Sequence, residues 1–139
     1  MREILFRGKR TDCEAWVEGD LIQAFRGKQL SSCSIMSNTP TAYCWKVIPE
    51  TVGQFTGLTD KNGVKIFEGD ICRFKRFNDV HVGKVIFNVT TASFIMWYQP
   101  IVGAYGEKAT QKMLLSVCDD IEVIGNIHDN SEILKNSIS

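Results

Sequence analysis

The stretch that decides the fold is Ile66-Phe67-Glu68-Gly69-Asp70-Ile71-Cys72, in which apolar residues flank a Glu-Gly-Asp triplet. Fifty residues earlier the chain carries the same pattern as Trp16-Val17-Glu18-Gly19-Asp20-Leu21-Ile22. Glycine tolerates positive φ, and the aspartate side chain accepts backbone N–H groups, so both residues favour turns. Each copy therefore predicts two strand segments joined at a tight polar corner, and together they indicate two β-units built on similar corners.

Outward from these corners, short apolar or alternating runs are separated by turn residues, as is typical of small β proteins. The expected strands cover residues 2–7, 15–18, 20–25, 29–36, 42–48, 64–67, 71–77, 82–87, 93–98, 112–117 and 121–128. Asp60-Lys61-Asn62-Gly63 is the strongest turn signal, because Asn-Gly tolerates the positive φ of a tight hairpin. Residues 31–41 are polar and weakly patterned and predict a mobile loop. Asn130 or Ser131 is expected to cap a helical turn through Lys135.

This pattern predicts a mainly β fold of small barrel-like β-units (SH3-like or similar) with a short C-terminal helical turn. We expect an N-terminal β-unit over 1–48, a linking segment and hairpin over 49–65, and a C-terminal small β-barrel unit over 66–139. The alternative is one continuous domain over 1–139. With 44% hydrophobic residues, a chain of 139 residues can bury a core.

Composition argues against several classes of protein. The formal net charge is zero, which disfavours a wholesale polyanion binder but leaves room for a local basic patch. No apolar run is long enough for a transmembrane helix or a signal peptide, so we expect a cytoplasmic protein with no membrane partner. The cysteines lack the close pairing of a disulfide framework or a zinc site, so neither a metal nor another cofactor is expected. These cysteines are Cys13, Cys33, Cys44, Cys72 and Cys118.

Several segments, in order along nearly the whole chain, carry a family resemblance. These segments are residues 1–9, 16–22, 48–58, 60–63, 66–71 and 123–130. In these segments the chain resembles the YopX family of small bacteriophage and prophage proteins. The resemblance implies a β-rich fold, a phage or prophage gene and a protein free in the bacterial cytoplasm. It implies no activity and no catalytic or ligand-binding residues.

The first candidate site is formed by the corner carboxylates Glu18, Asp20, Glu68 and Asp70. Paired carboxylates can bind Mg²⁺ or act as general acid and base, as a metal-dependent nuclease or hydrolase requires. The simpler interpretation is turn chemistry, with each Asp accepting backbone N–H groups. The two corners would have to meet in space for chelation.

The second candidate site is basic and aromatic, the combination with which small barrels bind nucleic acid. It consists of Arg73, Lys75, Arg76, Phe77 and Lys84, with His81 beside them. Arg2, Arg7, Lys9 and Arg10 add a second basic cluster. The alternative is a solvated strand face whose charges discourage edge-to-edge pairing.

The remaining candidates favour structural roles. His81 and His128 have no nucleophile or acid at a recognisable spacing, and the apolar run 94–98 is typical of a core strand, a subunit interface being the alternative. We therefore expect a phage-derived, non-catalytic binding or interaction protein. Its candidate partners are nucleic acid, a host or phage protein, or a second copy of the chain in a homo-oligomer.

Overall fold

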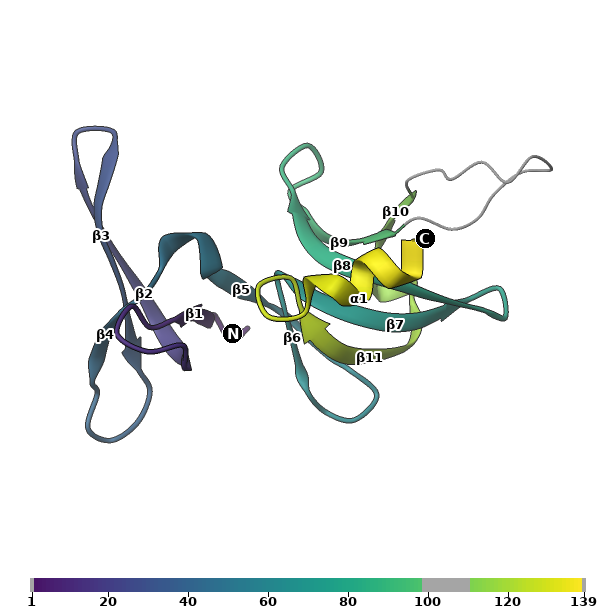
Figure 1. Ribbon diagram of the computed structural model, residues 1–139, viewed down its shortest axis with the longest axis horizontal. Helices are drawn as coiled ribbons and strands as arrows, with labels where there is room; N and C mark the ends of the chain where they lie inside the picture. Colours follow the sequence, from purple (N-terminus) through teal and green to yellow (C-terminus); the bar gives the residue numbers. More distant parts are fainter. Residues whose placement is uncertain (1, 99–110, 139) are drawn as a thin grey trace. The chain divides into compact units, whose positions relative to one another are not determined.

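Antiparallel strands dominate the computed structural model, which describes residues 2–98 and 111–138 (Figure 1). The first sheet has the strand order β4-β3-β2-β1-β5-β6 and the second has the order β10-β9-β8-β7-β11. The first contains β1 (Phe6–Lys9), β2 (Trp16–Arg26), β3 (Gln29–Ser37), β4 (Cys44–Lys46), β5 (Gly53–Thr59) and β6 (Lys65–Phe67). The second contains β7 (Asp70–Arg76), β8 (Asp79–Asn88), β9 (Ser93–Tyr98), β10 (Gln111–Leu114) and β11 (Asp119–Asn126). The prediction of a mainly β fold is confirmed.

The chain forms two compact units, Met1–Gly57 and Leu58–Ser139, with the boundary inside β5. Each unit has its own apolar core. The buried centre of the first consists of Cys33, Ile35 and Val47. The core of the second consists of Ile66, Cys72, Phe74, Val85, Met96, Tyr98, Leu115, Cys118 and Ile121. Short 3₁₀ turns, η1 (Pro49–Thr51) and η2 (Leu115–Val117), lie in the first and second unit respectively.

The prediction of small barrel-like β-units is confirmed only in part, because no closed barrel is detected among the residues that the structure describes. In the first unit only an isolated bridge, between Arg10 and Val47, links the segments that follow β1 and β4, and these two strands do not pair with each other. In the second unit the sheet stays open, because a loop and not a strand occupies the outer edge of β11. Lys61 donates its backbone N–H to the Ile121 carbonyl at 2.9 Å, and the Asp60 carboxylate accepts the N–H of Val123 at 3.0 Å.

The two Glu-Gly-Asp triplets adopt different structures. The second is the predicted corner between β6 and β7: Gly69 has φ +92°, and the Asp70 carboxylate, 1% exposed, accepts the N–H of Phe67 at 2.8 Å. The first lies inside β2, where Gly19 is paired on both sides, with β1 and with β3. A Cβ on Gly19 would lie 1.9 Å from the Met36 carbonyl oxygen. The first predicted corner is therefore wrong, because a close backbone approach and not a turn requires this glycine.

Three local predictions are refined by the structure. The Asp60–Gly63 segment joins β5 to β6 as predicted, although only Gly63 in it has positive φ. The predicted mobile loop over 31–41 is largely wrong, because its polar residues up to Ser37 alternate with the buried Cys33 and Ile35 along β3. The predicted strand over 42–48 shortens to the three residues of β4.

The C-terminal element is a helix, α1 (Ser131–Ile138), and is longer than the predicted single turn. It follows Asn130, whose side-chain oxygen accepts the N–H of Asn126 at 3.2 Å. A Cβ on Gly125 would lie 2.8 Å from this same oxygen, so the absence of a side chain at Gly125 leaves space for Asn130. The helix packs beside β8 in the second unit (Figure 1). Within the described residues, no helix is both long enough and apolar enough to cross a bilayer.

We predict that Gly19→Ala destabilises the first unit severely, by more than about 2 kcal/mol, because the added methyl group would overlap the backbone of β3. Gly27→Ala is the matched control: Gly27 has φ +64°, with no atom within 4 Å of the added Cβ, so only a backbone cost of about 1 kcal/mol is expected. Urea unfolding of both variants measures the difference. Equal losses would show that Gly19 is not sterically required.

Asp60 is a buried carboxylate, 7% exposed, that holds three backbone donors. Besides Val123, it accepts the N–H groups of Asn62 at 2.8 Å and Val64 at 2.9 Å. Desolvation raises its pKa, but these hydrogen bonds and the charge of Lys61 outweigh that effect, so the pKa of Asp60 lies below its ordinary value of 3.8. One side chain thus organises the β5–β6 turn and the edge of β11.

We predict that Asp60→Ala lowers the free energy of unfolding by about 2–3 kcal/mol, because it leaves three donors without their acceptor. The lowered pKa means that the stabilisation from Asp60 is fully present above pH 3.8 and is lost as the pH falls through the folded-state value. Urea unfolding between pH 3 and pH 7 therefore tests both points, with Asp79→Ala, a change at an exposed carboxylate, as control. A variant with the stability of the parent at neutral pH would contradict this role.

Candidate nucleic-acid interface

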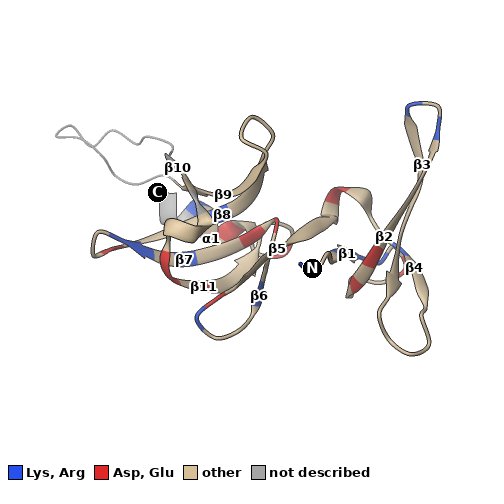
Figure 2. Ribbon diagram, turned by 180° about the vertical axis from the view of Figure 1, so that it is seen from behind, with Lys and Arg blue, Asp and Glu red and all other residues tan. Residues whose placement is uncertain are grey.

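Three of the five predicted interface residues share one face of the second sheet. Arg73 and Lys75 alternate along β7 with buried residues, so their side chains point away from the core. Lys84 of β8 is directly opposite Ile71 of β7. Since Ile71 is two residues before Arg73, Lys84 lies on the same face as Arg73. Figure 2 shows Lys and Arg along the end of β7 that leads into the β7–β8 hairpin.

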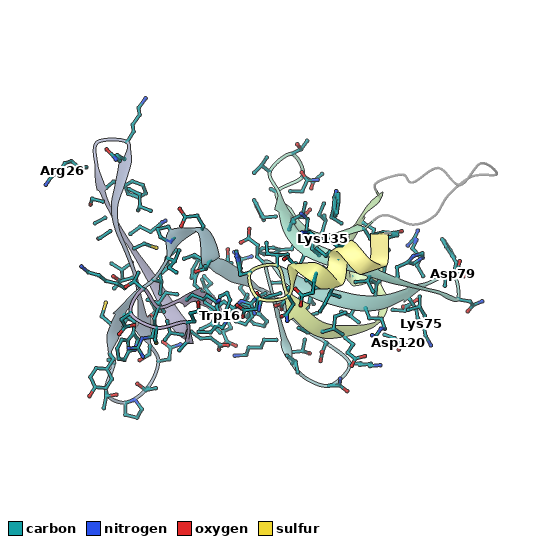
Figure 3. All side chains as sticks on the ribbon, in the orientation of Figure 1. Trp16, Arg26, Lys75, Asp79, Asp120 and Lys135 are labelled. Carbon is teal, nitrogen blue, oxygen red and sulfur yellow. The ribbon has the colours of Figure 1, made fainter. Side chains whose placement is uncertain are left out.

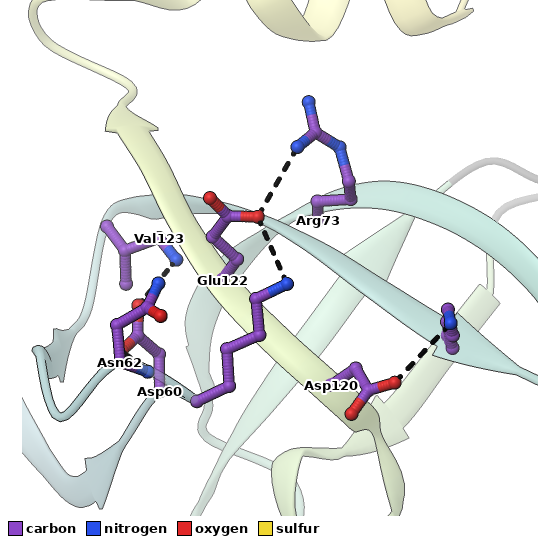
Figure 4. Close-up of polar contacts among 8 residues, drawn as sticks. Asp60, Asn62, Arg73, Asp120, Glu122 and Val123 are labelled. Carbon is purple, nitrogen blue, oxygen red and sulfur yellow. Dashed lines mark hydrogen bonds and ion pairs between the residues drawn. The ribbon is translucent and has the colours of Figure 1, made fainter.

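Carboxylates of β11 lie beside the β7 cations. Lys75 Nζ is 3.5 Å from an Asp120 oxygen, and these residues lie together in Figure 3. Arg73 Nη1 is 3.4 Å from Glu122 Oε2, which also lies 3.5 Å from Lys61 Nζ (Figure 4). Pairs this exposed contribute at most about 1 kcal/mol each. They nevertheless cancel much of the positive charge on this face, and sequence reasoning missed them because β11 is distant in the chain.

Lys84 has an aromatic partner that the sequence analysis did not identify. Its ammonium group lies 4.7 Å from the centre of the Trp97 ring, and the two residues are directly opposite in the β8–β9 pair. Both side chains are half-buried. The contact between Lys84 and Trp97 follows from the register of the β8–β9 pair, which a local sequence pattern does not give.

Phe77 occupies the tip of the β7–β8 hairpin. Its side chain is 82% exposed, and the backbone has φ +50° at Phe77 and φ +70° at Asn78. Two successive positive φ values are typical of the tight turns that match the twist of a hairpin, where Gly, Asn and Asp are preferred. A phenylalanine in this conformation is an outlier that stores strain.

Arg76 differs from the other cations, because it lies on the core side of β7 and not beside Arg73 and Lys75. Its guanidinium carbon lies 4.5 Å from the centre of the Phe77 ring. It is close enough to the buried Cys118 to lower the pKa of that thiol, yet burial dominates and raises the pKa of Cys118 to about 11. The thiol is therefore protonated at neutral pH, and Cys118, like Cys72, is a small buried hydrophobe.

The predicted basic cluster of the first unit is divided between two faces. Arg7 and Lys9 lie on one face of β1, 5.0 Å and 5.7 Å from the centre of the Trp16 ring. Arg10 lies on the opposite face, with its guanidinium carbon 3.7 Å from the centre of the Trp45 ring.

Arg10 is further engaged by Asp12, which accepts hydrogen bonds from Nε at 2.9 Å and from Nη2 at 2.5 Å. The hydrogen bond with Arg10 lowers the pKa of Asp12 and raises that of Arg10. Through this forked pair and its stacking on Trp45, Arg10 links the β1–β2 connection to β4. The role of Arg10 is therefore structural.

The corner carboxylates have separate environments. Asp70 serves its turn, whereas Glu18 and Asp20 are exposed on β2 of the other unit. Among the described residues no group of three or more His, Cys, Asp or Glu side chains is placed to hold a metal ion.

The other sequence candidates lie in packed surroundings. The ring of His81 lies 5.6 Å from that of Phe74 and 5.0 Å from that of Tyr98, which agrees with a structural histidine. His128 lies in the turn after β11. The run 94–98 lies within β9, with Ile95 and Met96 pointing to opposite faces and both buried, so the prediction of a core strand is confirmed.

Comparisons with known proteins agree with this architecture. Protein EF1440 from Enterococcus faecalis has a crystal structure that is similar to this chain, with a TM-score of 0.56 and 23% sequence identity over 96% of this chain and 99% of that one. Identity this low shows a shared fold alone. No curated protein matches the chain. The YopX protein family, however, matches residues 5–135, and the chain therefore belongs to the YopX family.

Proposed function

We propose that this chain is a non-catalytic binding protein whose second unit contacts single-stranded nucleic acid through the tip of the β7–β8 hairpin. The observation that carries the proposal is Phe77, an aromatic ring almost fully exposed at a turn position that favours glycine or asparagine. Strain of this kind costs about 1–3 kcal/mol and concentrates at functional positions. Contact between the exposed Phe77 ring and a bound ligand would offset this strain.

The neighbouring charges support this choice of ligand. Arg76 flanks the Phe77 ring. Lys75 lies two residues before Phe77, beside the exposed carboxylates of Asp119 and Asp120 on β11. A phosphate can displace such a weak surface pair, because hydrogen bonds between a cation and a phosphate are among the stronger ones. Stacking of bases on an aromatic ring, with cations tracking the backbone, is the general mode of binding to single strands.

We predict that Phe77→Gly weakens binding to single-stranded DNA or RNA about tenfold or more, because stacking contributes about 1–3 kcal/mol per base. The same variant should be as stable as the parent or more stable by up to about 1 kcal/mol, because glycine accepts φ +50° without strain. Fluorescence anisotropy with labelled oligonucleotides at low and moderate salt measures binding, and urea unfolding measures stability.

Ala92→Gly is the matched control, because Ala92 also has a positive φ, +51°, in the β8–β9 turn of the same unit. This variant should gain similar backbone relief and keep full binding. Unchanged affinity in Phe77→Gly would remove the hairpin tip from the interface. Absence of binding by the parent protein even at low salt would overturn the proposed function.

The remaining expectations accompany this proposal as predictions. The family resemblance supports a phage or prophage gene and action in the bacterial cytoplasm. A homo-oligomer is a further candidate state, and a single monomeric mass by light scattering at high concentration would contradict it. A metal-dependent nuclease using Glu18, Asp20, Glu68 and Asp70 remains the alternative class. Nuclease assays with Mg²⁺ on the parent and on Asp20→Asn test it.

A further inference from the structure

The hairpin of β2 and β3 extends beyond its neighbouring strands. β1 pairs with β2 only as far as Gly19, and β4 pairs with β3 only from Ser34 to Met36. Leu21 and Ile22 pair with Ile35 and Ser34, which β4 also flanks. In the pairings of the described residues, the stretch 23–33 is therefore a two-stranded ribbon, which we term the β2–β3 arm. Figure 1 shows this arm projecting from the rest of its unit.

The charge of this region departs from the neutral balance of the whole chain. From Leu21 to Pro49 the sequence contains no Asp or Glu, while it contains Arg26, Lys28 and Lys46. The arm itself carries two of these cations at its end, on either side of Gly27, whose φ is +64°. Arg26 extends outward from the hairpin end in Figure 3. A projecting ribbon with cations and no carboxylate is complementary to a polyanion.

Small side chains on the outward face of the arm would let a ligand approach its backbone closely. On the face opposite the core, the arm carries the small pair Ala24 and Ser32, and at its base Ile22 is paired with Ser34. A register shift between Ala24 and Phe25 leaves the Phe25 side chain 58% exposed near the tip. Bulges of this kind re-aim a side chain.

We propose that the β2–β3 arm inserts into the major groove of double-stranded DNA, with Arg26 and Lys28 on phosphates. The groove is about 12 Å wide and admits a two-stranded ribbon. Two paired strands lie about 4.8 Å apart, and short side chains on the outward face let the backbone approach the groove floor. The inference extends the proposed nucleic-acid binding to a second surface and a second form of the ligand.

The test uses the full chain and fluorescence anisotropy with a labelled 20-base-pair DNA duplex of mixed sequence over a range of salt concentrations. Arg26→Ala/Lys28→Ala should weaken duplex binding at least about tenfold and reduce the slope of log affinity against log salt by about two. Lys61→Ala/Lys135→Ala, which removes the same charge from the second unit, is the matched control and should keep both the affinity and the slope of the parent.

An RNA duplex of the same sequence separates groove insertion from simple charge attraction, because the major groove of A-form RNA is too narrow for a ribbon. We expect at least about tenfold weaker binding to RNA. Equal binding to both duplexes, equal losses in both double variants, or no binding to duplex DNA at low salt would each overturn the arm proposal. Phe77→Gly with single strands reports on the proposed function separately, so either surface can fail while the other stands.

Discussion

The buried carboxylate of Asp60 is the constraint on which the second unit depends. By accepting the N–H groups of Asn62, Val64 and Val123, it shapes the β5–β6 turn and covers the edge of β11. A covered edge needs no further strand, so the sheet remains open and β11 stays paired with β7. That pairing in turn places Asp120 and Glu122 beside the cations of β7. The buried Asp60 thus lies against the strand, β11, whose Asp120 and Glu122 flank those cations.

Charge placement, and not net charge, distinguishes the surfaces of this protein. On β7 the cations of Arg73 and Lys75 face the carboxylates of Glu122 and Asp120, which cancel part of their charge. The β7–β8 tip differs from it by its exposed aromatic ring, and the β2–β3 arm differs from it because the arm contains no carboxylate. Both are hairpin ends, where the backbone is supported by one partner strand and side chains reach solvent on all sides. Local chemistry at hairpin ends is compatible with a formal net charge of zero.

The membership of the YopX family and the likeness to EF1440 agree on the fold and leave its chemistry open. The repeated Glu-Gly-Asp triplet illustrates how one local pattern serves two structures. At Gly69 the glycine supplies a positive φ, whereas at Gly19 it supplies the absence of a side chain beside the Met36 carbonyl. Both uses require glycine, so the residue alone does not tell a turn from a close approach between strands.

Local patterns in the sequence determined the mainly β class, the Asp60–Gly63 connection, the Gly69 corner, the buried Cys72 and Cys118 and the core strand β9. These features depend on alternation, turn residues and apolar runs over a few neighbouring positions. Only the tertiary structure decided that Gly19 lies within a strand, that β11 brings acids to Arg73 and Lys75, that Trp97 lies beside Lys84, and that Phe77 occupies a strained tip. Each of these depends on which strands pair and in which register. Pairing between distant strands is set by the packing of the whole core, and a short stretch of sequence does not contain that information.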